Sequence, residues 1–243
     1  MLWHPQTLRD PRLAGSEACW TCSCDPGRPT GLAILHCAAD GAVHAASTTL
    51  QFGKHPACSW GLRGTVAAEV MDGIGAALFA GPGEDPRGEW WEYAGEDMGA
   101  VYEREGTSHA KAQAKRVALQ RVARLEGQIA AGVSEVVSLR GEALYPFGEW
   151  RALLTAASAS ADLAKSLAAN FVRSHFGAWV SSHEAEAICI GLHHLRVLRQ
   201  GERVAARPLL EVPVKGKRGK RPLPEGVLRA MAPRGDEKGP LAR

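Results

Sequence analysis

Three stretches rich in apolar and β-forming residues follow one another early in the chain, at 19–25, 31–38 and 43–52. The first two are separated by Pro26-Gly27-Arg28-Pro29-Thr30, a composition that favours a turn. Short apolar runs joined by short turns usually pair with their neighbours in sequence. The pattern therefore predicts an antiparallel meander.

Helical spacing dominates after residue 64. The segment 64–80 alternates small and apolar positions, and 108–130 carries the clearest amphipathic stripe, formed by Ala114, Ala118, Val122, Leu125 and Ile129. Lys111 falls on this stripe one turn before it starts, so we expect its side chain to project over the end of the core. The remaining pattern predicts strands at 98–103 and 133–139, and helices at 150–157, 160–175 and 183–199. Strands followed by alternating strands and helices predict an α/β domain with a mixed sheet.

A Gly- and Pro-rich break follows the first predicted helix, and we expect a loop after it that contains Trp90, Trp91 and Tyr93. Aromatic residues in a loop more often belong to a small satellite core. They can also stack on bases at a DNA branch, which we keep as the second interpretation.

Composition divides the chain into three parts. Residues 1–17 lack periodicity and are expected to form an extension, 18–200 a single domain, and 201–243 a tail. The chain has a net charge of +3, but the tail, with 11 Lys and Arg against 5 Asp and Glu, carries +6, whereas residues 1–200 carry −3. In it, glycines alternate with basic residues that can either bind phosphates or only aid solubility, namely Lys215, Lys217, Arg218, Lys220 and Arg221.

The six cysteines include a Cys-x-x-Cys pair at Cys19 and Cys22, but no second pair follows at zinc-binding spacing. We therefore expect buried, reduced thiols rather than a zinc site. No run approaches the ~18 apolar residues that a membrane span needs, and the N-terminus lacks a signal-peptide pattern. The expectation is a soluble cytoplasmic protein.

Acidic residues stand at three places suited to chemistry. Asp25 ends the first strand within Asp25-Pro26-Gly27-x-x-Thr30-Gly31, where the glycines leave its carboxylate open to approach. Glu103 ends a predicted strand before the long helix. His183 and Glu186 lie three apart at the start of the last helix and can face one site, whereas Glu184 points elsewhere.

These motifs, in this order, resemble the RuvC-type Holliday junction resolvases, across about residues 19–200. The last motif here is His183-Glu184-Ala185-Glu186-Ala187-Ile188, where the family typically has Asp-x-Ala-Asp-Ala-Leu. The resemblance assigns catalytic and metal-binding roles to Asp25, Glu103 and Glu186, and to His183, where some members also have His. Glu186 in place of Asp is the departure, because one extra methylene shifts the carboxylate by roughly 1 Å and can weaken an enzyme.

The resemblance implies an RNase H-like α/β fold and a homodimeric endonuclease that nicks four-way junctions with two Mg²⁺ or Mn²⁺ ions per site. Asp25 would bridge the ions, Glu103 and Glu186 would each bind one, and His183 would bind the second ion or act as base. Imidazole is a poor Mg²⁺ ligand, so we expect Mn²⁺ to work at least as well. Lys111 and Lys115 are candidate phosphate contacts.

Two other functions are considered. The first is a junction-binding protein with a weakened site, motivated by His183 and Glu186. The second, a sugar-kinase or actin-like ATPase fold, is disfavoured because the chain has no room for a second comparable domain or another Gly-rich phosphate loop.

Overall fold

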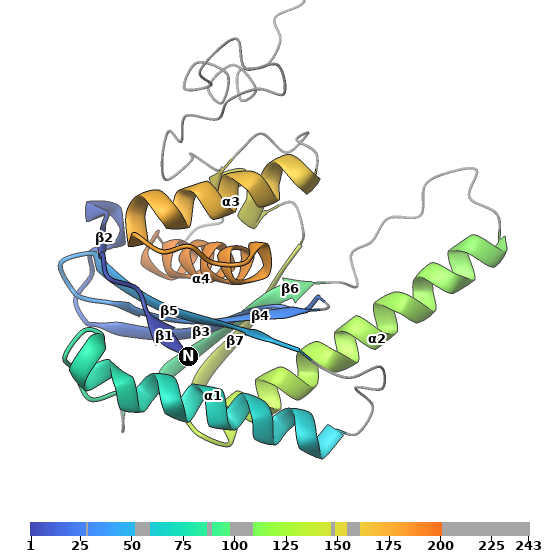
Figure 1. Ribbon diagram of the computed structural model, residues 1–243, viewed down its shortest axis with the longest axis horizontal. Coiled ribbons are helices and arrows are strands. Elements are labelled where there is room, and N and C mark those ends of the chain that lie inside the picture. The colour runs from blue at the N-terminus through green and yellow to red at the C-terminus, as the bar shows by residue number, and fades with distance from the viewer. Residues whose placement is uncertain are drawn as a thin grey trace, which may run out of the picture.

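The computed structural model describes residues 1–27, 29–51, 59–86, 89–97, 109–146, 149–154 and 161–200. Within them, seven strands form one sheet with the order β1-β5-β4-β3-β6-β7, and β2 also pairs with β5. Helices cover both faces of this sheet (Figure 1). Glu103 and the whole basic tail lie outside the described residues.

One half of the sheet is the predicted meander. β3 (Cys19–Asp25), β4 (Thr30–Cys37) and β5 (Ala42–Leu50) pair antiparallel in sequence order. Every residue of β4 is buried, as expected for a central strand covered on both faces. The predicted N-terminal extension adds β1 (Leu2–Trp3) and β2 (Leu8–Arg9) to β5, so it completes the edge of the sheet.

The other half of the sheet is parallel and differs from the sequence prediction. β6 (Trp91–Asp97) pairs parallel with β3, and β7 (Leu139–Pro146) pairs parallel with β6. Trp91 and Tyr93, predicted in a loop, lie instead in β6 and are fully buried, so base stacking by these two residues is wrong. The strand predicted at 133–139 was also misplaced, because the long helix continues to Ser134.

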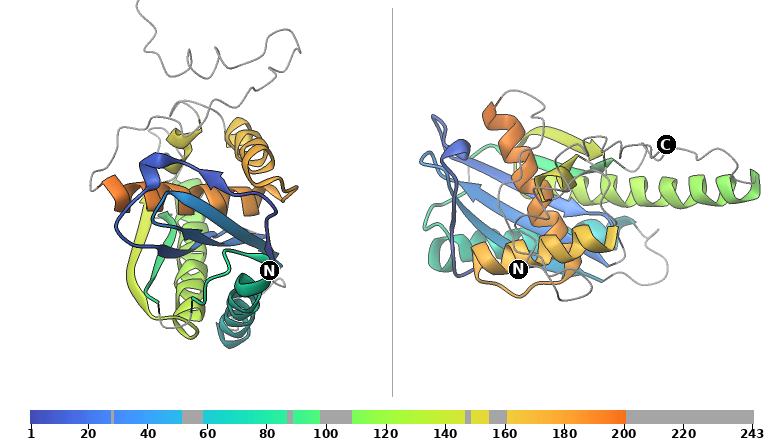
Figure 2. Two further views of the ribbon diagram at one scale, coloured as in Figure 1. Left: turned by 90° about the vertical axis from the view of Figure 1, so that its left-hand side faces the viewer. Right: turned by 90° about the horizontal axis from the view of Figure 1, so that it is seen from above.

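The helices form two outer layers (Figures 1 and 2). α1 (Ser59–Ala80) and α2 (His109–Ser134) cover one face, while α3 (Ala161–Phe176) and α4 (Ser182–Gln200) lie over the other. Two short 3₁₀ helices, η1 (Pro11–Leu13) and η3 (Trp150–Leu153), complete the described elements. The expected mixed sheet, an antiparallel meander plus parallel strands flanked by helices, is confirmed.

Alternation along the strands divides the interior into two cores. Trp20, Cys22 and Cys24 of β3 face α1 and α2, whereas Ser23 faces α4, where its hydroxyl donates to the Ala187 carbonyl. The five cysteines in the described residues are free thiols, as predicted, and four of them are buried. No helix in the described part of the chain is long and apolar enough to cross a membrane.

The first half of α2 extends beyond the edge of the sheet (Figures 1 and 2). Among the side chains of α2 that the structure describes, the buried ones begin at Leu125. Lys111 and Lys115 belong to this first half, but their side chains lie outside the described set. Their contact with phosphate stays a prediction.

Candidate metal centre

Asp25 stands at the carboxyl end of β3, on the face covered by α4. The side chain is largely buried, and its Oδ2 lies 2.6 Å from Nδ1 of His183. The turn that follows is closed by the Thr30 hydroxyl, which donates to the Gly27 carbonyl at 2.7 Å. A strand end and a tight turn thus fix the carboxylate where the sheet meets α4.

The glycines of this motif make room for α4. A Cβ on Gly31 would collide with the carbonyl of His183 and lie 2.9 Å from the amide nitrogen of Glu184. A Cβ on Gly27 would lie 3.2 Å from the His183 ring. The Asp-Pro-Gly-x-x-Thr-Gly pattern therefore seats the first turn of α4 directly over Asp25.

The start of α4 is held by a capping box. The Glu184 amide donates to the Ser181 hydroxyl at 3.2 Å, and the Ser181 amide donates to the Glu184 carboxylate at 3.4 Å. Glu184 also accepts a hydrogen bond from Thr49 of β5 at 2.6 Å. As predicted, Glu184 points away from Glu186, and it has a structural role that fixes the direction of His183.

Asp25, His183 and Glu186 come together from positions nearly 160 residues apart. Each offers one ligand atom, and these atoms all lie within 4.8 Å of one another. In the described part of the chain, this is the one group of such residues spaced to hold a metal ion. Glu186 is 3% exposed, so its carboxylate is directed into the protein.

Glu96 is a third acid at this centre, which sequence reasoning missed. The parallel register pairs Ser23 with Ala94, and continuing it places Glu96 level with Asp25 on the same face of the sheet. Glu96 is 4% exposed and accepts a hydrogen bond from the Trp150 indole at 3.2 Å. The alternation of Trp91, Tyr93 and Gly95 with Glu92, Ala94 and Glu96 is the signal that could have revealed this strand.

Two cations were also missed, and both lie against Glu186. Arg151 of η3 donates to Glu186 Oε1 at 3.3 Å, and Lys165 of α3 has its Nζ 4.0 Å from Oε2. Arg151 is buried, whereas the Lys165 side chain is 39% exposed and can reach a ligand from solvent. Nothing in the local pattern marks either residue, because each meets the site only through packing between distant elements.

The carboxyl groups of the centre hold their protons unusually tightly. Burial, reinforced by the charge of Asp25, raises the pKa of both Glu96 and Glu186 to about 7. Burial also raises the pKa of Asp25, although the hydrogen bond from His183 opposes this shift. Arg151 and Lys165 offset the negative charge only in part, so the centre favours additional cations.

Sequence comparison identifies no relative: no family model and no curated protein matches the chain. Among solved structures, the chain is similar to RuvC from Thermus thermophilus, both in one described as the structure of that protein and in one described as its complex with a Holliday junction substrate. Each match has 19% identity and a TM-score of 0.44, and covers 75% of this chain and 96% of that chain. Similarity this distant transfers no activity, so the function must be argued from the site.

The residues present fit a divalent cation. Mg²⁺ and Mn²⁺ prefer carboxylate oxygens, and an imidazole added to such a set favours Mn²⁺ over Mg²⁺. Asp25, His183 and Glu186 supply that combination within one ion's reach, and Glu96 lies beside them. Burial is the main cause of the raised carboxyl pKa values, and an ion bound there would favour the charged form of these carboxyl groups.

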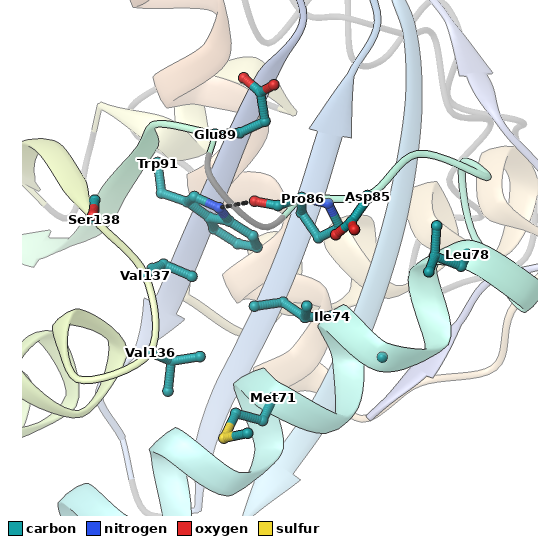
Figure 3. Close-up of a pocket in the computed structure, with 11 residues that line it drawn as sticks. Met71, Ile74, Leu78, Asp85, Pro86, Glu89, Trp91, Val136, Val137 and Ser138 are labelled. Carbon is teal, nitrogen blue, oxygen red and sulfur yellow. Dashed lines mark hydrogen bonds between the residues drawn. The ribbon is translucent and has the colours of Figure 1, made fainter.

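The pocket shown in Figure 3 lies elsewhere. It has a volume of about 530 Å³ and lies between α1, the segment before β6 and the connection from α2 to β7. Its polar residues include Asp85 and Glu89. Its apolar lining is formed by Met71, Ile74, Leu78, Trp91, Val136 and Val137. Trp91 is the first residue of β6, at the opposite end from Glu96. We place the chemistry at the smaller charged centre, because the pocket lining is mainly apolar and lacks clustered ligands.

Proposed function

We propose that the chain is a divalent-metal-dependent nuclease that nicks branched DNA, with four-way junctions as substrate. The convergence of Asp25, His183 and Glu186 within 4.8 Å carries the proposal, because carboxylate oxygens and an imidazole nitrogen are ligands of divalent ions, and buried groups with raised pKa values mark candidate functional sites. Glu96 joins this set as the acid of the neighbouring strand.

Metal ions held by these residues would lower the pKa of the attacking water and stabilise the leaving 3′ oxygen of a phosphodiester. Glu103, the acid assigned by resemblance, lies outside the described residues, and Glu96 is the acid that supports the proposal.

The chain's own residues supply positioning and proton transfer. When Asp25 accepts the Nδ1–H of His183, the ring is oriented and Nε2 keeps a lone pair, which can either bind an ion or take a proton from water. Arg151 fixes the carboxylate of Glu186, and the more exposed Lys165 can contact the phosphate that is cut.

The choice of branched DNA rests on the motif order and on the basic residues predicted to bind phosphates. A homodimer fits this substrate, because a four-way junction has two equivalent strands to nick and a two-fold dimer supplies two sites. Lys215, Lys217, Arg218, Lys220 and Arg221 of the tail, with Lys111 and Lys115 of α2, are the proposed backbone contacts.

The test is a nicking assay on a synthetic four-way junction with Mn²⁺ and with Mg²⁺. We expect the wild type to nick with either ion, at least as fast with Mn²⁺, and Asp25→Asn to lose this activity. Asp85→Asn, which changes an acid of the pocket in Figure 3, is the matched control and should retain it. Nicking that persists in Asp25→Asn would show that another residue or protein is responsible.

A second candidate is a junction-binding protein with little catalysis. The contact between Arg151 and Glu186 favours it, because a guanidinium already neutralises one of the expected ligands. Tight junction binding without nicking in either metal would support this alternative and contradict the nuclease.

A further inference from the structure

Trp179, in the connection between α3 and α4, exposes a large aromatic surface. Its side chain is 80% exposed, whereas Trp3, Trp20, Trp91 and Trp150 are all 9% exposed or less. Leaving an indole in water forfeits the stabilisation that burial would provide. Packing within the described domain therefore gives no reason for a tryptophan at this position.

The exposed indole is held in a defined arrangement. The Arg173 guanidinium of α3 lies 3.7 Å from the ring centroid, a cation–π contact that covers part of the ring. The connection begins at Gly177, whose φ of +67° suits glycine, and the Phe176 carbonyl just before it accepts a hydrogen bond from the Gln6 amide. It ends at Ser181, which caps α4. A short connection anchored at both ends limits the movement of Trp179.

Trp179 is also close in sequence to the candidate metal centre. It lies two residues before the capping Ser181 and four before His183, so the indole and the imidazole are both placed by the amino end of α4. α3, which carries Arg173, also carries Lys165 beside Glu186. α3 and α4 lie on the same face of the sheet (Figure 1).

We propose that Trp179 and Arg173 form a contact for the nucleic acid that the metal centre acts on, with the indole stacking on an unpaired base near the branch. This rests on the proposed function. A flat indole stacks on any base, and a guanidinium can bind the adjoining phosphate, so the pair matches the two chemical features that a nucleic acid presents side by side. The contact would favour open or branched DNA, because bases in an intact duplex are already stacked on their neighbours.

The test measures binding without cleavage. The full chain is titrated, with Ca²⁺ in place of Mn²⁺, against a labelled four-way junction and a linear duplex of equal length. Trp179→Ala should weaken junction binding by about fivefold to a hundredfold. Trp179→Phe, which keeps a flat ring, should restore most of the affinity. Phe79→Ala is the matched control, because Phe79 is 92% exposed but belongs to α1, which covers the other face of the sheet.

A second probe reports stacking directly. With 2-aminopurine at the branch, fluorescence should change on binding of the wild type and of Phe79→Ala, and change less with Trp179→Ala at saturating protein. Mn²⁺ binding by all variants should equal that of the wild type, which separates this contact from the metal centre.

The outcomes are distinguishable from those of the nuclease test. If Trp179→Ala binds the junction as tightly as the wild type, the stacking contact is wrong, and the exposed ring then suits a protein partner. If the wild type binds but never nicks, while Trp179→Ala binds more weakly, the contact is supported and the nuclease proposal fails.

Discussion

The two ends of the central strands β3 and β6 differ sharply in chemistry. At their amino ends, Trp20 and Trp91 stack with ring centroids 5.2 Å apart beside an apolar pocket. At their carboxyl ends, Asp25 and Glu96 are buried with raised carboxyl pKa values. Burial of the tryptophans stabilises the fold at the amino ends of the strands, whereas burial of charged carboxylates destabilises it at the carboxyl ends.

The two ends of the same strands therefore have different roles. The apolar end and the helices packed on it stabilise the sheet, and the rigid sheet then holds carboxylates in positions they would not adopt alone. Glu184 and Glu186 also differ, one being stabilised by its contacts and the other buried at a cost, although both lie within a single turn of α4. Glu184 is satisfied by Thr49 and the helix cap, while Glu186 has cations beside it and a raised pKa.

The largest effect is expected where α4 meets the β3–β4 turn. Gly31→Ala should push the first turn of α4 away, because the added Cβ would meet backbone atoms of His183 and Glu184. A displacement of ~1 Å can cost about a hundredfold in rate. We therefore expect nicking to fall by about this factor, measured on the four-way junction.

The control for Gly31→Ala is a glycine beside the apolar pocket, at the amino ends of β3 and β6. Gly75 of α1 lines the pocket, and a Cβ there meets nothing within 4 Å. Gly75→Ala should raise stability by about 0.5–1 kcal/mol through helix propensity and leave nicking unchanged. Equal nicking rates for Gly31→Ala and Gly75→Ala would contradict the close packing of the first turn of α4 against Gly31.

The pH dependence of activity follows from the carboxylate end. Glu96 and Glu186 have pKa values of about 7, and protons compete with metal ions for their oxygens. At a fixed, subsaturating Mn²⁺ concentration, nicking should drop by about tenfold from pH 8 to pH 6. Raising the Mn²⁺ concentration should move the midpoint to lower pH. A rate independent of pH over this interval, at every metal concentration, would contradict the titration of these acids.

A smaller effect is expected from Glu126 of α2, on the face opposite the metal centre. Burial, with the charge of Glu96 adding to it, raises the pKa of Glu126 from an ordinary 4.5 to about 8. The folded state therefore binds this proton more tightly than the unfolded state, so the free energy of unfolding decreases as the pH rises from 4.5 to 8. Glu126→Gln removes the ionisation and should be more stable than the wild type at pH 8, by at most about 4 kcal/mol.

Denaturant unfolding of the metal-free protein at pH 5.5 and pH 8 measures this effect. Glu135→Gln changes an exposed acid just after the end of α2 and should leave the difference between the two pH values unchanged. If Glu126→Gln shows the same pH dependence as the wild type, Glu126 is not protonated in the fold.

Much of this architecture follows from local pattern. Turn residues between β-rich runs predict β3 to β5, and the apolar periodicity around Leu125 and Ile129 predicts α2. The i, i+3 spacing predicts that His183 and Glu186 face one site, whereas Asp25 is grouped with them by the resemblance of the motifs to the RuvC-type resolvases. A local pattern indicates where a side chain points but not how far it lies from a side chain of another element. The convergence of these three residues is therefore seen only in the structure.

The errors also have physical causes. The Gly- and Pro-rich break before Trp91 suggested a continuing loop, which concealed β6 and with it Glu96. Val133 and Val137 resemble a strand, but Val133 extends the buried face of α2 and Val137 lines the pocket. Arg151 and Lys165 meet Glu186 through contacts between separate elements, which no single segment encodes.

The most direct test is Mn²⁺ binding at pH 8, followed by electron paramagnetic resonance of the free ion, with one variant set for each end of the strands. Asp25→Asn and Glu186→Gln should lose high-affinity binding, whereas the pocket variants Asp85→Asn and Glu89→Gln should bind like the wild type. Unchanged Mn²⁺ affinity in Asp25→Asn and Glu186→Gln would contradict a metal centre at the carboxyl ends of β3 and β6.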